Sequence, residues 1–101
     1  MPSDETALNK VLSILPEATY RKMMGEYLLY YDGRLFGGIY DNRLLLKITK
    51  ASAIMLRHHD SAFPYEGGGE MILFPEPYDA ELLWDVVTAM CSQLPEKKQK
   101  D

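Results

Sequence analysis

Apolar side chains near the start of the chain recur three or four positions apart, which predicts a helix with one buried side. The recurring positions are Ala7, Leu8, Val11, Leu12 and Leu15. Ser3 can cap this helix at its N-terminus, and Pro16 ends it because proline has no amide hydrogen to donate.

Two-residue turn sequences divide the next segment, Tyr20 to Lys50, into three predicted strands. Asp32-Gly33 and Asp41-Asn42 tolerate the positive φ angles of tight hairpins, and runs rich in tyrosine, leucine, isoleucine and phenylalanine flank each pair. This pattern indicates an antiparallel meander. Gly37-Gly38 interrupts the middle strand, which favours a bulge or a close approach by a helix backbone.

Alternation along these strands predicts which face of the sheet the helices cover. Leu44, Leu46 and Ile48 point one way and are expected to face the helices. The opposite face is then partly apolar, since it receives Tyr27, Leu29, Tyr31 and Leu45. Such a face often marks a surface for a partner or for a second copy of the chain, although one bulge would invert the assignment.

The second half of the chain predicts a short helix and then a hairpin. Thr49 can cap the helix. Its expected inner face comprises Ala51, Ile54, Met55 and His58. Residues 63–65 and 71–74 are the expected strands of the hairpin, spanned by the glycines at 67–69, and Pro64 confines the earlier strand to an edge.

A last helix follows, which Asp79 can cap and Pro95 ends. Its apolar stripe comprises Leu82, Leu83, Val86, Val87 and Met90. Tyr78 is expected to pack on Leu83 beside the cap. Residues 96–101 are charged, have no apolar anchor and are expected to be a disordered tail.

The order of elements predicts one domain over residues 1–95, of the α+β class. It is a two-layer α-β(3)-α-β(2)-α arrangement, an antiparallel sheet of five strands with helices on one face.

Composition narrows the classes of function. The chain is 47% apolar with a mean hydropathy of -0.24, and no apolar run approaches the ~20 residues of a membrane helix. Its polar N-terminus and single cysteine favour the cytoplasm. Net charge is -4, yet residues 20–57 hold seven basic side chains against three acidic ones. This layout could steer an acidic partner, or it could reflect the preference of solvated turns and strand ends for arginine and lysine. With a pI near 5.1, direct binding to nucleic acid is not expected.

Several segments together resemble the N-terminal domain of the TfoX/Sxy competence regulators. The segments are Arg21-Lys22-Met23-Met24-Gly25, Leu29-Tyr30-Tyr31-Asp32-Gly33, Leu35-Phe36-Gly37-Gly38-Ile39, Leu44-Leu45-Leu46-Lys47, Phe63-Pro64-Tyr65 and Leu83-Trp84. The resemblance implies a secretion-chaperone-like fold in a stand-alone, single-domain member. It also implies a non-enzymatic regulatory role in expression of DNA-uptake genes, with the transcription machinery or the cyclic-AMP receptor protein as partner.

The expected partner surface combines the apolar sheet face with the segment where the chain enters the sheet. It comprises Arg21, Lys22, Met24, Gly25, Tyr27, Tyr31 and Lys47. Gly25 could permit a bulge or a residue with positive φ, which would display the two cations and the methionines at an edge, and methionine suits adaptable contacts. The alternative is structural: Met23 and Met24 fill the core and Arg21 pairs with a helix carboxylate.

The remaining candidates for chemistry are weak, so no catalytic residue, cofactor or metal is expected. Adjacent His58 and His59 project about 100° apart on a helix and do not clamp an ion readily, even with Asp60 beside them. Cys91 has no basic neighbour in sequence and is expected to be an apolar filler. An alternative is a small ligand-binding protein or enzyme with a cleft near Tyr65, the Gly67–Gly69 loop and His58.

Overall fold

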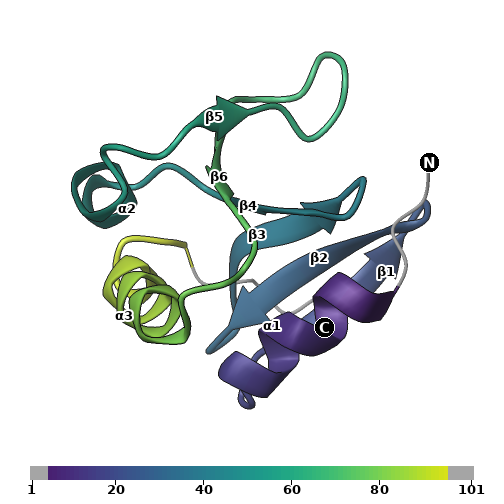
Figure 1. Cartoon of the computed structure of the whole chain (residues 1–101), viewed down its shortest axis with the longest axis horizontal. Coiled ribbons are helices and arrows are strands. Elements are labelled where there is room, and N and C mark those ends of the chain that lie inside the picture. The colour runs from purple at the N-terminus through teal and green to yellow at the C-terminus, as the bar shows by residue number, and fades with distance from the viewer. Residues whose placement is uncertain (1–4, 96–101) are drawn as a thin grey trace.

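A computed structural model describes residues 5–95, which form one antiparallel sheet and three helices (Figure 1). In chain order the elements are α1 (Glu5–Ile14), β1 (Thr19–Met23), β2 (Glu26–Tyr31), β3 (Arg34–Tyr40), β4 (Arg43–Leu46), α2 (Lys50–Met55), β5 (Ser61–Ala62), β6 (Met71–Phe74) and α3 (Ala80–Cys91). The strand order in the sheet is β1-β2-β3-β4-β6-β5. The α+β class is confirmed. The cap at Ser3 and the tail at 96–101 lie outside the described residues.

The sheet has six strands rather than five, because Met24-Gly25 makes a third tight turn between β1 and β2. Both residues have positive φ, 53° and 85°, as do the two residues of Asp32-Gly33 and of Asp41-Asn42. Paired positive φ angles match the twist of antiparallel strands and make two-residue hairpins. The sequence interpretation missed this turn because methionine rarely adopts positive φ.

The main core lies between the sheet and the helices, which cover one face (Figure 1). Helices α1 and α3 contribute Ala7, Leu8, Val11, Leu83, Val86, Val87 and Met90. The sheet contributes Tyr27, Leu29, Phe36, Ile39, Leu44, Leu46, Ile72 and Phe74. A second, smaller buried cluster contains no helix residue and lies on the other face. We call that other face the open face.

A bulge in β3 decides which side chains reach the open face. Tyr30 pairs with Leu35 and Leu29 pairs with Gly37, so Phe36 is an extra residue between them. Without this extra residue, the turns at Asp32-Gly33 and Asp41-Asn42 would place Tyr27 on the same face as Leu45. The bulge shifts the register by one residue and moves Tyr27 to the opposite face, because side chains alternate along a strand. The expectation that Tyr27, Leu29 and Tyr31 share the open face is therefore wrong, whereas Leu45 does lie there.

The caps predicted for the last two helices are present. The Leu82 amide donates to Asp79 Oδ1 at 3.1 Å, and Thr49 and Ser52 form a reciprocal capping box at 3.1 and 2.7 Å. The inner face of α2 differs from the prediction, because Ser52 is buried and Ile54 is 56% exposed. Ser52 Oγ donates to the Lys47 carbonyl at 2.8 Å, which satisfies its hydroxyl.

Strand β5 lies two residues earlier than predicted, at Ser61–Ala62. Phe63 and Tyr65 are exposed and belong to the loop that follows. No helix among residues 5–95 has the length and apolar content needed to cross a bilayer.

Tyr78 packs against the helix-side core with its hydroxyl group buried. Its ring lies 6.1 Å from that of Phe74, and its hydroxyl is buried with no hydrogen-bond partner among residues 5–95. Burial, and then Glu76, raises the pKa of Tyr78 to about 12. Because tyrosine in an unfolded chain ionises near pH ~10, the stability that this shift supplies is complete below pH ~10 and declines toward pH ~12.

We therefore expect Tyr78→Phe to keep or raise the free energy of unfolding at neutral pH, by up to about 1 kcal/mol, because it removes an unsatisfied polar group. It should also lessen the alkaline decline. Urea unfolding at neutral and alkaline pH measures both effects, with Tyr65→Phe as the exposed control. A loss of more than about 1 kcal/mol at neutral pH would mean that the hydroxyl stabilises the fold.

Candidate functional site

The open face carries a small apolar cluster that the helices do not cover. Its buried members are Tyr40, Leu45 and Met71, with Leu28, Ala62 and Leu73 packed against them. The ring of Tyr40 lies over Gly38, where a Cβ atom would come within 2.7 Å of the ring carbon Cε2. Glycine at this position therefore lets the tyrosine ring lie against the sheet. Burial, then Tyr65, Glu26 and Tyr30, raises the pKa of Tyr40, so its hydroxyl stays protonated.

The loop between β5 and β6 is fastened to this face. Tyr65 meets Tyr40 edge to face, with ring centroids 6.3 Å apart. Arg43 donates through Nη2 to the Phe63 carbonyl at 3.0 Å and through Nε to the Tyr40 carbonyl at 3.2 Å. These contacts join the loop to the turn between β3 and β4.

Two hollows on this face share Tyr40 and Tyr65. The first, which we call the methionine hollow, has a volume of about 530 Å³. Its lining comprises Met23, Met24, Glu26, Leu28, Tyr40 and Tyr65. The second has a volume of about 340 Å³, and Lys47, Glu70 and Pro64 are among its lining residues. The methionine hollow is the more apolar one, because one carboxylate and two phenols are its only polar side-chain groups.

Met24 lines the methionine hollow and has an unusual backbone conformation and exposure. Its side chain is 95% exposed and its φ is +53°. Positive φ costs a residue with a Cβ about 1 kcal/mol. Because the Met24 side chain is exposed, no hydrophobic burial offsets this cost. Of the two alternatives for Met24, the one in which it fills the core is therefore wrong, and the side chain is displayed.

The predicted partner residues divide between the two faces. Arg21, Lys22, Met24 and Gly25 lie together in β1 and its turn, and Lys47 lines the second hollow. Tyr27 is only 3% exposed in the helix-side core, and Tyr31 packs edge to face on Trp84 of α3 at 6.2 Å. Neither tyrosine reaches the open face. Partner binding by the other five residues stays a prediction.

The residues of the alternative ligand site do not form one pocket. Tyr65 and Gly69 line the second hollow of the open face. His58 lines a separate hollow with His59 and Asp60. His59 stacks on Phe74, with ring centroids 5.8 Å apart. In the part of the chain that the structure describes, no group of three histidine, cysteine or acidic side chains could hold a metal ion.

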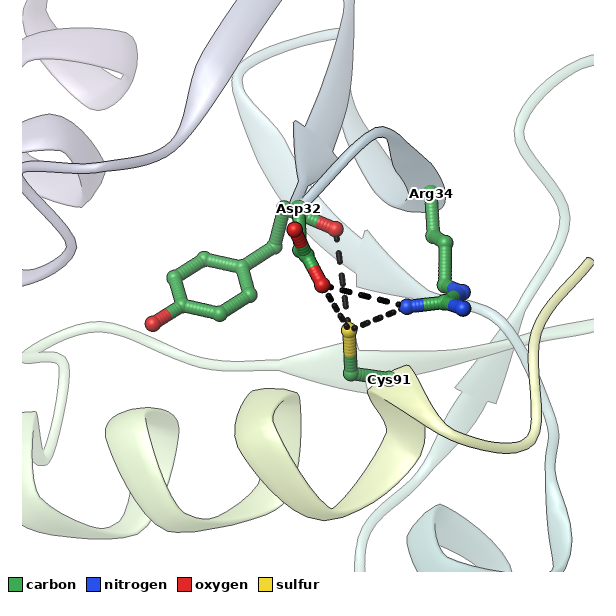
Figure 2. A network of polar contacts seen from close by, with 4 residues as sticks. Asp32, Arg34 and Cys91 are labelled. Atoms are coloured by element: carbon green, nitrogen blue, oxygen red, sulfur yellow. Dashed lines mark hydrogen bonds and ion pairs between the residues drawn. The ribbon is translucent and has the colours of Figure 1, made fainter. Parts of the chain in front are cut away.

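A polar network that sequence spacing could not reveal joins the β2–β3 turn to the end of α3 (Figure 2). Arg34 Nη1 donates to Asp32 Oδ2 at 3.2 Å and to Cys91 Sγ at 3.4 Å, and the thiol lies 3.8 Å from the Tyr31 carbonyl oxygen. Cys91 thus has a basic neighbour in space, although it has none in sequence. The last turn of α3 has no basic residue of its own, so Arg34 supplies a cation at the negative end of the helix dipole.

The fold and this surface define a small α+β domain with one helix-covered sheet face and one open face. The chain belongs to the TfoX N-terminal domain family, whose model matches residues 10–86. This match confirms the resemblance found in the sequence. The chain is also 30% identical over 80 residues to an uncharacterized 12.7 kDa protein in the trpE 5′ region of Spirochaeta aurantia, an alignment that covers 78% of this chain and 70% of that protein. No solved structure matches the chain significantly.

Proposed function

We propose that the chain is a non-enzymatic regulatory domain that acts by binding another protein at the methionine hollow. The domain then acts in transcriptional control of DNA-uptake genes, the role that its resemblance to the competence regulators implies. On this proposal the partner belongs to the transcription machinery, with the cyclic-AMP receptor protein as the first candidate. The domain would contribute a contact surface rather than a reaction.

The main support for the proposal is that Met24 combines a positive φ with an almost fully exposed apolar side chain. No burial therefore offsets the cost of the φ angle, which a glycine or asparagine would lower. The hairpin requires a positive φ at this position but does not require methionine, and residues strained in this way cluster at ligand clamps and other functional sites. Methionine is also the side chain that adapts most readily to a partner surface.

The methionine hollow gives such a contact its anchor point. Protein interfaces concentrate their binding energy in a few large side chains that fill apolar pockets. A volume of about 530 Å³ accommodates an aromatic or leucine side chain of the partner. Met23, Met24 and Tyr65, all strongly exposed, would then close around it.

Met24→Asn should change stability and binding in opposite directions. Asparagine tolerates positive φ, so the free energy of unfolding should rise by about 1 kcal/mol, which raises Tm by roughly 4–8 °C. Partner recovery by the tagged domain from extracts of its own organism should fall about tenfold, as expected for the loss of ~1.4 kcal/mol of contact. Thermal unfolding and quantitative mass spectrometry of captured proteins measure the two effects.

Ile54→Gln is the matched control, because Ile54 is an exposed apolar residue on α2, in the helix layer. It should leave the captured protein unchanged. Equal capture by the parent chain and Met24→Asn would remove the proposed contact. A fall in Tm for Met24→Asn would show that the methionine serves the fold instead.

A further inference from the structure

Among the described residues 5–95, no strand pairs with the outer side of β1, which makes β1 an open edge of the sheet. It is the last strand at its end of the strand order and pairs with β2 (Figure 1). All five of its residues, Thr19 to Met23, are exposed. An edge of this length offers a row of backbone groups to which another strand can pair.

The turn geometry identifies the backbone groups that point outward. In a two-residue hairpin the residues next to the turn, here Met23 and Glu26, exchange both backbone hydrogen bonds. Bonded and non-bonded pairs alternate, so Arg21 also bonds inward to Leu28. The amide and carbonyl groups of Tyr20 and Lys22 therefore point away from β2.

Charge argues against a second copy of the chain as the occupant of this edge. In the antiparallel register that pairs all five residues of two β1 strands, Arg21 would face Arg21 of the second copy. Like charges directly opposite each other destabilise a sheet. Acidic side chains at the positions facing Arg21 and Lys22 would be attracted instead.

The sheet face to which each β1 side chain points determines which residue types an added strand needs. Arg21 and Met23 pair with Leu28 and Glu26, so they share the open face with the methionine hollow. Lys22 pairs with Tyr27 and points to the other face. A matching strand thus carries two adjacent acidic residues, one for each cation, and next to them a large apolar residue facing Met23.

We propose that β1 receives an extended acidic segment of the partner as an added strand. This inference rests on the proposed function and names the kind of partner segment. Backbone bonds to Tyr20 and Lys22 would supply affinity, and the acidic pair and apolar residue would supply specificity.

A pair of substitutions at one position separates backbone pairing from charge. Lys22→Pro removes the outward amide hydrogen but leaves the inward bonds of Arg21 and Met23, as proline at a sheet edge allows. Lys22→Thr removes the same charge and keeps the amide. The probe is a short fluorescent peptide of threonine and valine with a central Glu-Glu pair flanked on both sides by leucine, compared with the same peptide carrying Lys-Lys.

The parent domain should bind the Glu-Glu peptide, measured by fluorescence anisotropy, about tenfold or more tightly than the Lys-Lys peptide. Lys22→Pro should weaken binding by about tenfold beyond the effect of Lys22→Thr. Equal affinity of the two variants, equal affinity for the two peptides, or no binding of the Glu-Glu peptide would each overturn the proposal.

A second measurement covers the case in which Lys22→Pro does not fold. On addition of the Glu-Glu peptide to the parent domain, the amides of Tyr20 and Lys22 should become protected from hydrogen exchange, and unchanged exchange would overturn the proposal. A dimer in light scattering that Lys22→Pro dissociates would assign the edge to a second copy and would also overturn it. Loss of partner capture by Met24→Asn but not by Lys22→Pro would leave the proposed function standing and remove only the added strand.

Discussion

Gly37→Ala is expected to destabilise the domain by about 3 kcal/mol or more, because β3 and β4 are too close at this point for any side chain. A Cβ atom on residue 37 would lie 2.2 Å from the Leu45 carbonyl oxygen and 3.1 Å from the Leu46 Cα atom. Both are backbone atoms, so no rotamer change relieves the overlap. The strands would have to separate at the centre of the sheet, where Gly37 pairs with Leu46. Tm should fall by roughly 12–24 °C, measured by thermal unfolding.

Gly69→Ala is the matched control for this prediction. A Cβ atom there meets nothing within 4 Å, and the φ of Gly69 lies outside the left-handed region. Its Tm should therefore stay within a few degrees of that of the parent chain. If Gly37→Ala unfolded at the same temperature as Gly69→Ala, the close approach of β4 at Gly37 would be contradicted.

The helices could be predicted from the sequence because the residues that start, end and bury each helix lie within a few positions of one another. The apolar stripe of α1, the proline that follows it and the caps at Thr49 and Asp79 depend on neighbours in sequence, and the structure bears them out. Asp32-Gly33 and Asp41-Asn42 were equally readable, since aspartate, asparagine and glycine are the residues that favour such turns. Gly37-Gly38 indicated a bulge or a close approach, and both occur, although the approaching backbone belongs to β4 rather than to a helix.

The candidate site was harder to predict because its features depend on contacts between distant segments. Arg34 and Cys91 lie 57 positions apart, so spacing gave no hint of their contact. Methionine is not a typical residue of two-residue turns, so the turn at Met24-Gly25 could not be predicted in the way that the other two hairpins could. Without that turn β1 and β2 read as one strand, and the edge formed by β1 could not be predicted. The tyrosines were assigned to the wrong face because alternation is exact only until a bulge intervenes.

Phe36→Ala is expected to cost about 3–5 kcal/mol, since it removes the side chain that stabilises this bulge. Phe36 is fully buried in the helix-side core, although it is the extra residue of β3. Its burial favours the shifted register, which in turn directs Tyr27 to the helices and Leu28 to the methionine hollow. Phe63→Ala should cost less than about 1 kcal/mol, because Phe63 is 56% exposed. Urea unfolding of the two variants measures the difference, and similar losses would mean that the aromatic ring of Phe36 does not hold the register.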